Sequence, residues 1–330
     1  MTSAGSDRLL LLVAGLVIDG LFGDMPALFR HIPHPIVLAG RAIAFFDRKL
    51  NRETRSEESR YYRGIITVIV LVGAAAALGV AIERLCRGQP LGAVVEALLI
   101  AVLVAQRSLY EHVAAVAGAL NSGGLAAGRT AVRHIVGRDP ASLDAHGVAR
   151  AAIESLAENF SDGVVAPAFW YLLLGLPGLF AYKMANTLDS MIGHRTARYR
   201  SFGWAAARFD DAFNLVPAPI SGLLLVAAAV FADRCRPDRA LAILLRDGRK
   251  HHSPNAGWPE SAMAGALGLS LAGPRRYPEG VVVDPWLGDG SARAATSDII
   301  RALHLYRLAC LIEAGLLLGA WLTVHLTLPV

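Results

Sequence analysis

Charged residues and cysteines are scarce in this chain. Of its 330 residues, 18% are charged and 54% are hydrophobic, and only three are cysteines. A composition so poor in charge excludes an ordinary soluble enzyme and predicts a polytopic membrane protein. The formal net charge of +5 is a modest excess. The cytoplasmic preference of Lys and Arg and their attraction to anionic lipids account for it, so we expect no nucleic-acid partner.

Several familiar motifs are also missing. Cys86, Cys235 and Cys310 lie far apart and form no C-x-x-C pair, so they indicate neither a cysteine zinc site nor a disulfide framework. The chain has no Walker loop, Rossmann fingerprint, H-E-x-x-H or G-x-S-x-G string. The apolar run at 9–18 is followed by no small-residue cleavage site. We therefore interpret it as a retained first membrane helix.

Long apolar runs are abundant. Windows of about 20 residues, the length that crosses hydrocarbon, occur near 8–23, 64–82, 91–106, 163–182, 215–232 and 308–326. Prolines interrupt 163–182 and 215–232, and lipid-exposed chain does not tolerate the broken backbone hydrogen bonds that follow. We therefore predict an all-α fold. It is a polytopic membrane helical bundle, a single integral-membrane domain over 1–330 with four to six spans and Pro-broken or re-entrant helices.

Two polar segments, 107–162 and 233–307, are predicted to be cytoplasmic. The first is predicted to be helical, and the second to be mixed, with turns at Ser253-Pro254-Asn255, Gly273-Pro274 and Asp284-Pro285. Gly123-Gly124 and Asp139-Pro140 mark breaks in the first of them. Basic residues are in excess in 24–63 and 233–307, which predicts a cytoplasmic location for both. The expected location is the inner (cytoplasmic) membrane, with the active site facing the cytoplasm. Strict alternation would put 183–214 on the other side, so either the Pro-broken segments are not both crossings or the site lies at membrane depth.

Acidic and amide side chains gather between residues 154 and 214, beside strongly apolar sequence. Such groups are costly near lipid unless they face a polar cavity or a ligand. Glu154, Glu158 and Asp162 are spaced by four residues and would form one stripe on a helix. Their mutual repulsion favours a bound cation or cationic partner. A solvated helix face is the alternative, and acid spacing alone favours it.

The string from Tyr182 to Arg195 follows an apolar segment. Lys183, Asn186 and Ser190 share a helical face there, with Asp189 at its edge. A lysine with two hydrogen-bonding side chains at a membrane boundary suits a phosphate or carboxylate ligand. For Lys183 the competing interpretation is snorkelling to the membrane interface.

Asp210, Asp211 and Asn214 form a third polar group. Adjacent acids on a helix diverge by about 100 degrees, so only one can share a face with Asn214. We favour Asp211 as its partner and as an oxygen ligand for Mg²⁺. Helix N-terminal charge placement is the alternative.

The segment 253–260 contains two prolines, a glycine and a tryptophan. It predicts a rigid loop that presents Asn255 and Glu260. His34 lies close to the first span. Taken alone, it is predicted to have a structural role rather than to act as a ligand or a base.

Five strings, taken in order, carry a family resemblance. They are H-P-I-x-L-A-G at His34, E-S-x-A-E-N-x-S-D-G at Glu154, Y-K-M-x-N-T-L-D-S-M-x-G at Tyr182, F-G-x-A-A-A-R-x-D-D-x-x-N at Phe202 and S-P-N-A-G-W-P-E-S-A-M-A-G-A-L at Ser253. The set resembles the adenosylcobinamide-phosphate synthase family of cobalamin biosynthesis over residues 9–320. Phe160 is a small departure, because many relatives are expected to carry a polar residue there.

The resemblance implies a membrane ligase that joins a propionate carboxyl of adenosylcobyric acid to (R)-1-aminopropan-2-ol or its O-phosphate. It also implies ATP as co-substrate and Mg²⁺ as cofactor. Other membrane enzymes of the corrinoid pathway are candidate partners. Phosphorylation of a carboxylate requires Mg²⁺ on oxygen ligands and cations that neutralise developing charge, which agrees with the residue types present.

The hypothesis assigns these residues to three groups. The catalytic group is Glu154, Glu158, Asp162, Lys183 and Glu260, in which Glu158 or Glu260 accepts the amine proton. The substrate-binding group is His34, Asn159, Asn186, Ser190, Arg195, Asn214, Asn255 and Trp258. The metal group is Asp189, Asp210 and Asp211.

Two other functions compete with this ligase. A membrane alcohol phosphotransferase is suggested by Asp189, Arg198 and Asp210, but the spacing of these residues argues against it. A small-molecule transporter would line its path with polar residues on Pro-broken helices, yet the sequence shows no related halves. A nucleotide-dependent amide product would separate all three.

Overall fold

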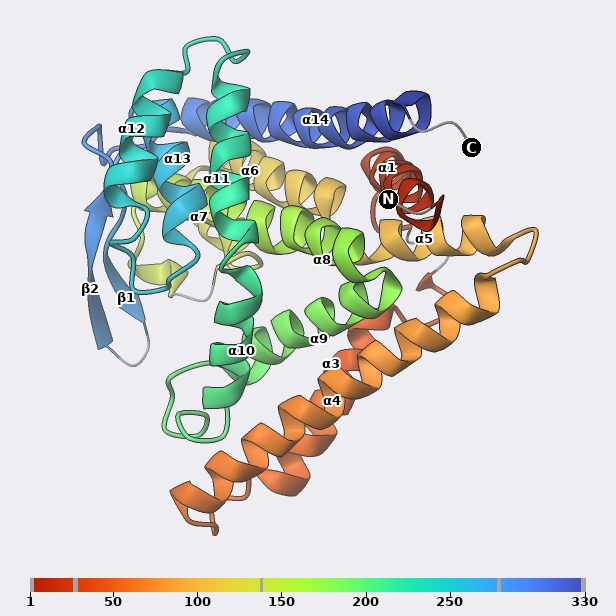
Figure 1. Ribbon diagram of the computed structural model, residues 1–330. Helices are drawn as coiled ribbons and strands as arrows, with labels where there is room; N and C mark the ends of the chain where they lie inside the picture. The colour runs from red at the N-terminus through yellow and green to blue at the C-terminus, as the bar shows by residue number, and fades with distance from the viewer. Residues whose placement is uncertain (1–2, 26–28, 137–138, 278–279, 328–330) are drawn as a thin grey trace. The chain divides into compact units, whose positions relative to one another are not determined.

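The protein is described by a computed structural model over residues 3–25, 29–136, 139–277 and 280–327 (Figure 1). Its helices confirm the all-α prediction. The chain divides into two compact units made of interleaved segments. Unit 1 comprises Met1–Ala105, Ala166–Asn214 and Leu317–Val330, and unit 2 comprises Gln106–Val165 and Leu215–Leu316.

Unit 1 contains the helices that precede residue 105 and those between 166 and 214. They are α1 (Ser3–Phe22), α3 (Pro35–Leu50), α4 (Glu57–Cys86), α5 (Gly92–Leu103), α8 (Ala166–Leu174), α9 (Leu176–Ile192) and α10 (Trp204–Asn214). The longest, α4, begins with a capping serine: the hydroxyl of Ser56 accepts the N–H of Ser59 at 3.2 Å. Glu57 and Glu58 lie in its first turn, where their negative charges interact favourably with the positive end of the helix dipole.

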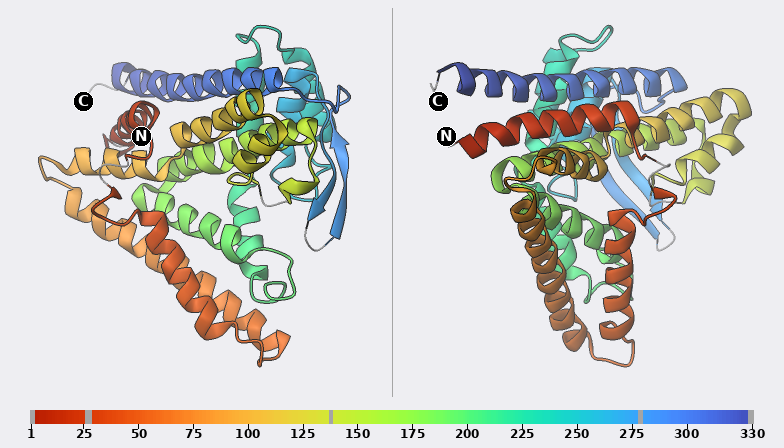
Figure 2. Two further views of the ribbon diagram at one scale, coloured as in Figure 1. Left: turned by 180° about the vertical axis from the view of Figure 1, so that it is seen from behind. Right: turned by 90° about the vertical axis from the view of Figure 1, so that its right-hand side faces the viewer.

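The core of unit 1 joins α3, α4, α9 and α10. Ile43, Leu71, Leu188 and Phe202 are among its buried side chains, and α4 runs along α9 (Figure 1). The α3–α4 pair is also visible from two other directions in Figure 2. Since apolar residues on α9 recur at helical spacing toward this core, the opposite face of α9 carries its polar side chains.

The window predicted at 163–182 contains three helical pieces. A π-helix (Ser161–Val165) leads into α8, and the chain then breaks at Gly175 before α9. Gly175 has φ = 72°, and a side chain there would collide with Glu83 and Arg8, whose ion pair measures 3.1 Å between Oε1 and Nη2. Pro177 lies in the first turn of α9, where its missing N–H costs nothing. The expected interruption is therefore confirmed.

Three helical stretches of the described chain are long and apolar enough to cross a membrane. They are Glu57–Cys86, Gly92–Val132 and Thr296–Leu326, and the pair α10 with α11 (Pro217–Ala229) is a fourth if it counts as one broken span. Each overlaps a predicted window. These helices indicate a membrane protein. The windows 8–23 and 163–182 stay predictions as crossings.

Unit 2 contains the remaining elements. They are α6 (Gln106–Val132), a 3₁₀ turn (Pro140–Ser142), α7 (Ala145–Phe160), the π-helix, α11, α12 (Pro237–Asp247), α13 (Gly257–Leu267), β1 (Leu271–Tyr277), β2 (Gly280–Leu287) and most of α14 (Thr296–Thr327). Both predicted breaks of its first segment are confirmed: Gly124 interrupts α6 with φ = 65°, and Asp139 caps the 3₁₀ turn.

The sequence interpretation did not include the antiparallel hairpin of β1 and β2 (Figure 2). The two strands run from the pair Leu271 and Leu287 to the pair Tyr277 and Gly280, with an irregularity between Ala272 and Pro274. Strand prolines are tolerated at such irregularities and at edges. The turn signals at Gly273-Pro274 and Asp284-Pro285 therefore lie inside strands.

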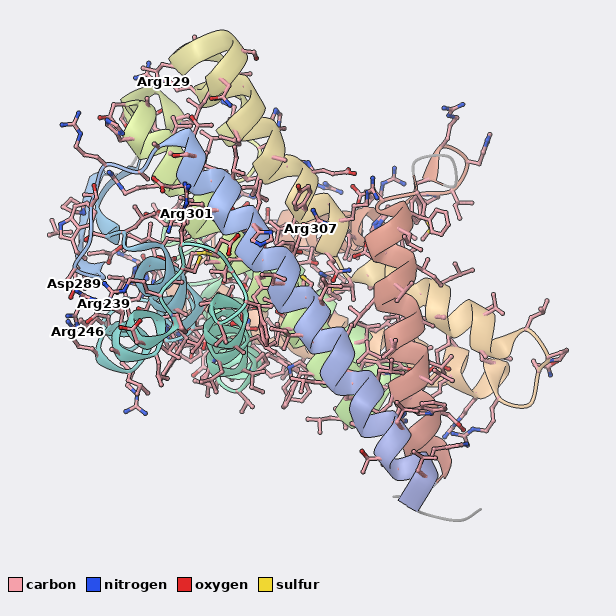
Figure 3. The ribbon with its side chains drawn as sticks, turned by 90° about the horizontal axis from the view of Figure 1, so that it is seen from above. Arg129, Arg239, Arg246, Asp289, Arg301 and Arg307 are labelled. Carbon is pink, nitrogen blue, oxygen red and sulfur yellow. The ribbon has the colours of Figure 1, made fainter. Side chains whose placement is uncertain are left out.

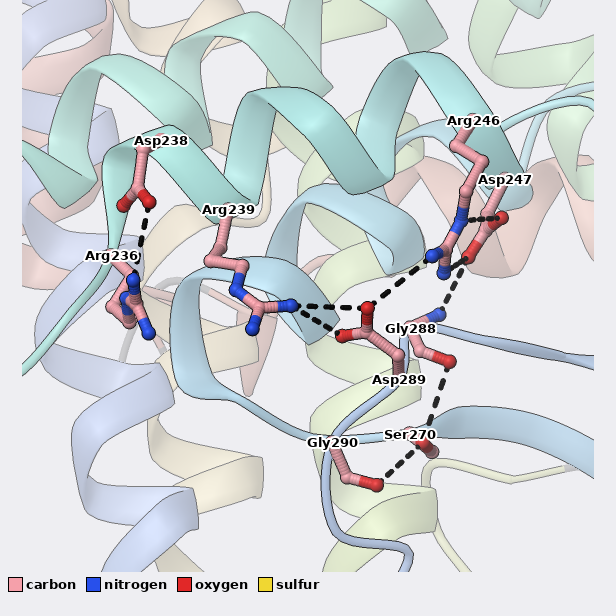
Figure 4. A network of polar contacts seen from close by, with 9 residues as sticks. All are labelled: Arg236, Asp238, Arg239, Arg246, Asp247, Ser270, Gly288, Asp289 and Gly290. Carbon is pink, nitrogen blue, oxygen red and sulfur yellow. Dashed lines mark hydrogen bonds and ion pairs between the residues drawn. The ribbon is translucent and has the colours of Figure 1, made fainter.

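A network of ion pairs joins α12 to the end of the hairpin (Figures 3 and 4). Asp247 is fully buried and accepts from Arg246 Nη2 at 2.7 Å, Lys250 Nζ at 2.6 Å and the Gly288 amide at 2.8 Å. Asp289 accepts from Arg239 Nη1 at 3.0 Å. Burial alone would raise the pKa of Asp247, but these donors outweigh burial and hold its pKa below the usual range.

Candidate functional site

The polar face of unit 1 is a hydrogen-bonded cluster on α9 and α10. The hydroxyl of Tyr182 donates to Asn214 Oδ1 at 3.1 Å, and Asn214 Nδ2 donates to Asp210 Oδ2 at 3.1 Å. The second oxygen of Asp210 accepts from Asn186 Nδ2 at 3.4 Å. Tyr182, Asp210 and Asn214 are buried. We call Tyr182, Asn186, Asp189, Asp210 and Asn214 the amide–acid cluster.

The electrostatics of the amide–acid cluster come from two carboxylates. The charge of Asp189, three residues after Asn186 on α9, acts on Asp210. Two nearby carboxylates repel each other, and a divalent cation with oxygen ligands relieves that repulsion. Amide groups such as Asn186 and Asn214 can orient carboxylates without neutralising them. The donor set therefore fits Mg²⁺.

The structure corrects the predicted pairing of Asn214. Its amide bonds to Asp210, four residues earlier, and not to the favoured Asp211. Asp211 Oδ2 instead lies 3.1 Å from Arg208 Nη1. The i, i+4 geometry of α10 explains the difference, because residues four apart lie one above the other on a helix.

Four other predicted residues of unit 1 lie at or near α9. Lys183 is half-buried, Ser190 is exposed with its hydroxyl donating to the carbonyl of Asn186 at 2.8 Å, and Arg195 is exposed after the helix. His34 caps α3, accepting the N–H of Ile36 on Nδ1 at 3.2 Å. Burial lowers the pKa of His34, the charge of Asp24 opposes this shift, and that of Lys183 adds to it.

In unit 2, two of the three acids of the predicted stripe lie on α7 and the third lies beyond it. Glu154 is buried and accepts the backbone N–H of Ala272 on β1 at 2.9 Å. Glu158 and Asn159 are exposed. Asp162 lies beyond the end of α7, in the π-helix, whose wider turn breaks the four-residue register. Glu154 and Glu158 keep the predicted four-residue spacing within α7, and the full stripe with Asp162 stays a prediction.

The predicted loop at 253–260 is confirmed only in its first part, because α13 begins at Gly257. Ser253 Oγ accepts from the amides of Asn255 and Ala256, both at 3.3 Å. Trp258 Nε1 donates to the carbonyl of Pro254 at 3.2 Å. Asn255 and Glu260 are buried, the latter in the first turn of α13. This loop holds its polar side chains in fixed positions inside unit 2.

One group in unit 2 escaped the sequence interpretation. His251, His252 and Asp284 bring one potential ligand atom each within 4.8 Å of one another. The adjacent histidines are visible in the sequence, but Asp284 lies on β2, more than 30 residues further along the chain. Only the hairpin brings it to them. The paired histidines beside the Ser253-Pro254 turn were the available signal.

Comparison with known proteins decides the family. The family model described as CobD/Cbib protein matches residues 12–306. A Sinorhizobium sp. protein described as cobalamin biosynthesis protein CobD is 52% identical over 314 residues, 94% of this chain and 97% of the relative. The chain belongs to the CobD/Cbib family. Proteins of the same description from Rhizobium meliloti, 49% identical over 92% of this chain and 94% of the relative, and Rhodobacter capsulatus, 47% identical over 91% and 93%, agree.

Membership of the CobD/Cbib family confirms the resemblance drawn from the five strings. The chain is therefore a cobalamin biosynthesis protein. Membership of this family implies that it is a biosynthetic enzyme. No solved structure matches this chain.

Proposed function

We propose that this CobD/Cbib protein is an ATP- and Mg²⁺-dependent acid–amine ligase of the cytoplasmic membrane. Its substrates would be adenosylcobyric acid and (R)-1-aminopropan-2-ol or the O-phosphate of that amine. The carboxylate takes the terminal phosphoryl group of ATP and releases ADP. The amine then attacks the acyl carbon, phosphate leaves, and the amide product is adenosylcobinamide or its phosphate.

The observation that carries the proposal is the amide–acid cluster in a protein of this family. Two carboxylates among side-chain amides suit a Mg²⁺-bound polyphosphate, because Mg²⁺ prefers oxygen ligands. We assign Asp189 and Asp210 as the main metal ligands. Asp211, which is paired with Arg208, is assigned a smaller contribution to metal binding. When bound, Mg²⁺ supplies charge neutralisation for phosphoryl transfer.

The other residues of unit 1 fit the phosphate and substrate roles. Lys183 is half-buried on the same helix as Asn186 and Asp189, and suits a phosphate oxygen. Asn186 and Asn214 orient Asp210 through their amides. Arg195 and Ser190 are exposed and suit outer parts of the substrate. The Nδ1 atom of His34 caps α3, so only the rest of its imidazole ring is assigned to contact substrate.

The predicted residues of unit 2 keep the roles that the sequence assigned to them. Glu158 is exposed on α7, and we assign it to the proton that the attacking amine must lose. Glu260, buried in α13, is the second candidate for that base. Asn255 on the loop and Trp258 in the first turn of α13 are assigned to orient substrate. Glu154, Asn159 and Asp162 complete the proposed set on α7 and the π-helix. The contact of Glu154 with the hairpin favours positioning over chemistry.

The direct test is a reaction of the purified full-length protein with adenosylcobyric acid, ATP, Mg²⁺ and each amine separately. Product mass and ADP release are the measurements. An amide product that requires both ATP and Mg²⁺ supports the proposal, and the amine that is used shows whether it arrives phosphorylated. ATP-independent product, or none with either amine, contradicts it. Glu158→Gln should abolish ligation without loss of insertion; retained turnover removes Glu158 from the mechanism.

A further inference from the structure

The group of His251, His252 and Asp284 stands apart from the residues proposed for Mg²⁺ and ATP. It lies wholly within unit 2, where the end of α12 leads through Lys250 into the Ser253 loop and faces β2. One ligand atom from each of the three residues comes within 4.8 Å of the others. We propose that these residues bind a divalent transition-metal ion of the Zn²⁺, Co²⁺ or Mn²⁺ class.

The spacing of the potential ligand atoms is close to that of a metal site. His252 Nδ1 lies 3.1 Å from Asp284 Oδ1. Two ligand atoms on a tetrahedral zinc ion, with bonds of about 2.0–2.1 Å, lie about 3.3 Å apart. The measured separation is thus close to the edge of a coordination tetrahedron. A metal here takes the place of the proton between the imidazole and the carboxylate.

Burial explains why a cation is favoured at this point. Asp284 has only 4% of its side chain exposed, while the His252 side chain has 46% exposed. A buried carboxylate is stabilised by an adjacent positive charge, which can be an imidazolium or a metal ion. The half-exposed His252 gives a metal a path from solvent. The competing explanation is therefore specific: a His252–Asp284 ion pair without metal.

The third ligand, His251, is buried and its ring is held in place. The amide of Ser253 donates to His251 Nδ1 at 3.1 Å, and the two histidine rings lie with centroids 4.5 Å apart. A metal bound at His251 Nδ1 exchanges this hydrogen bond for a coordinate bond. Ser253 is half-exposed, so water can take over its amide.

The ligand types determine the metal class. Two imidazoles and one carboxylate favour zinc and its neighbours over Mg²⁺ and Ca²⁺, which prefer oxygen ligands alone. Three protein ligands leave an open coordination position, as in catalytic rather than structural zinc sites. Water or an anionic substrate oxygen would occupy it. The site is close in sequence to Asn255, but the proposal rests on side-chain geometry and does not depend on the ligase reaction.

The test is spectroscopic and independent of activity. Full-length protein in detergent, freed of any histidine tag and of bound metal by a chelator, is titrated with Co²⁺, and the visible d–d absorption of Co²⁺ is recorded. One equivalent should bind with a tetrahedral or five-coordinate spectrum, and Zn²⁺ should displace it. His252→Ala and Asp284→Asn should each weaken apparent affinity by more than about tenfold.

The matched control is His112→Ala, because His112 is an exposed histidine on α6 of the same unit. Its titration should equal that of the unchanged protein. Because His252 is half-exposed and Asn replaces Asp with little change in volume, both test variants should fold, and their melting temperatures without metal verify this. Absence of Co²⁺ binding, binding unchanged in both variants, or a thiolate charge-transfer band from a cysteine would each overturn the proposal.

Discussion

Two buried acids, Asp210 in unit 1 and Asp247 in unit 2, are stabilised in different ways. In unit 1, Asp210 is held by the neutral amides of Asn186 and Asn214, beside the like charge of Asp189. In unit 2, Asp247 is held by Arg246, Lys250 and a backbone amide. Cations neutralise a carboxylate, whereas amides only orient it. The first arrangement remains suited to a ligand cation, and the second serves the fold.

The strongest way to break this comparison is Asp210→Asn. The substitution keeps the size of the side chain but removes a negative charge proposed for Mg²⁺. We expect the turnover number for amide formation to fall by about 10²- to 10³-fold, as when a group that stabilises a transition state is removed. Asp211→Asn is the control and should lower turnover less than tenfold. Equal losses in both variants would show that the two acids act alike.

Asp247→Ala tests the other half of the comparison. It removes the shared acceptor of Arg246, Lys250 and the Gly288 amide, so the free energy of unfolding should fall by about 3 kcal/mol. Thermal unfolding in detergent provides the measurement. Asp238→Ala on the same helix removes only an exposed partner of Arg236 and should cost less than about 0.5 kcal/mol. A small effect of Asp247→Ala would make the network dispensable.

The effect of Asp247 should also depend on pH. Its pKa is lower in the folded state than in the unfolded chain, so its contribution is complete above the unfolded value and is lost as pH falls. The unfolded value for aspartate is about 3.9. The difference in melting temperature between wild type and Asp247→Ala should therefore be constant near neutrality and shrink below about pH 4. A constant difference down to pH 2 would contradict the assignment.

Substitutions of Glu154 test whether this residue only positions the hairpin or also takes part in the reaction. In Glu154→Ala, the Ala272 amide loses its acceptor in a buried place, which should cost about 2 kcal/mol. Glu154→Gln keeps an acceptor oxygen and should cost less than 1 kcal/mol. If Glu154→Gln is stable yet loses amide formation, Glu154 acts in the chemistry as well as on the hairpin. Melting temperature and turnover, measured together, separate these outcomes.

The smallest expected effect is that of His34→Ala. Loss of the cap on α3 should cost about 1 kcal/mol, and His34→Ser should restore most of it, because serine caps helices well. Thermal unfolding of the three proteins is the check. Full stability of the alanine variant would mean that the hydrogen bond to Ile36 contributes little. His34 would then keep only its proposed role in substrate binding.

Much of the helical fold follows from hydropathy and proline. The windows 64–82, 91–106 and 308–326 coincide with long apolar helices, because a continuous apolar run leaves few alternatives. The hairpin could not be predicted in the same way, since Pro274 and Pro285 are turn signals that here occupy strand positions at and near an irregularity. Pairing between strands is decided by contacts that a local pattern does not contain.

The candidate site was predictable where one helix carries it. Asn186 and Asp189 were named from their helical spacing, whereas Tyr182 begins a family string but was not predicted as a site residue; the structure adds it through its hydrogen bond to Asn214. The partner of Asn214 was wrong because adjacent acids on α10 are nearly equivalent by sequence. The pairing of Asp284 with His252 joins residues 32 positions apart, and no periodicity connects them.

The order of segments has a consequence for biosynthesis. Residues from Leu317 onward belong to unit 1, although that unit begins at the N-terminus. Neither unit is one continuous stretch of the chain, so unit 1 holds all its segments only after residues beyond 316 have been synthesised. A chain that stopped after residue 316 would contain every segment of unit 2 but would lack the last segment of unit 1.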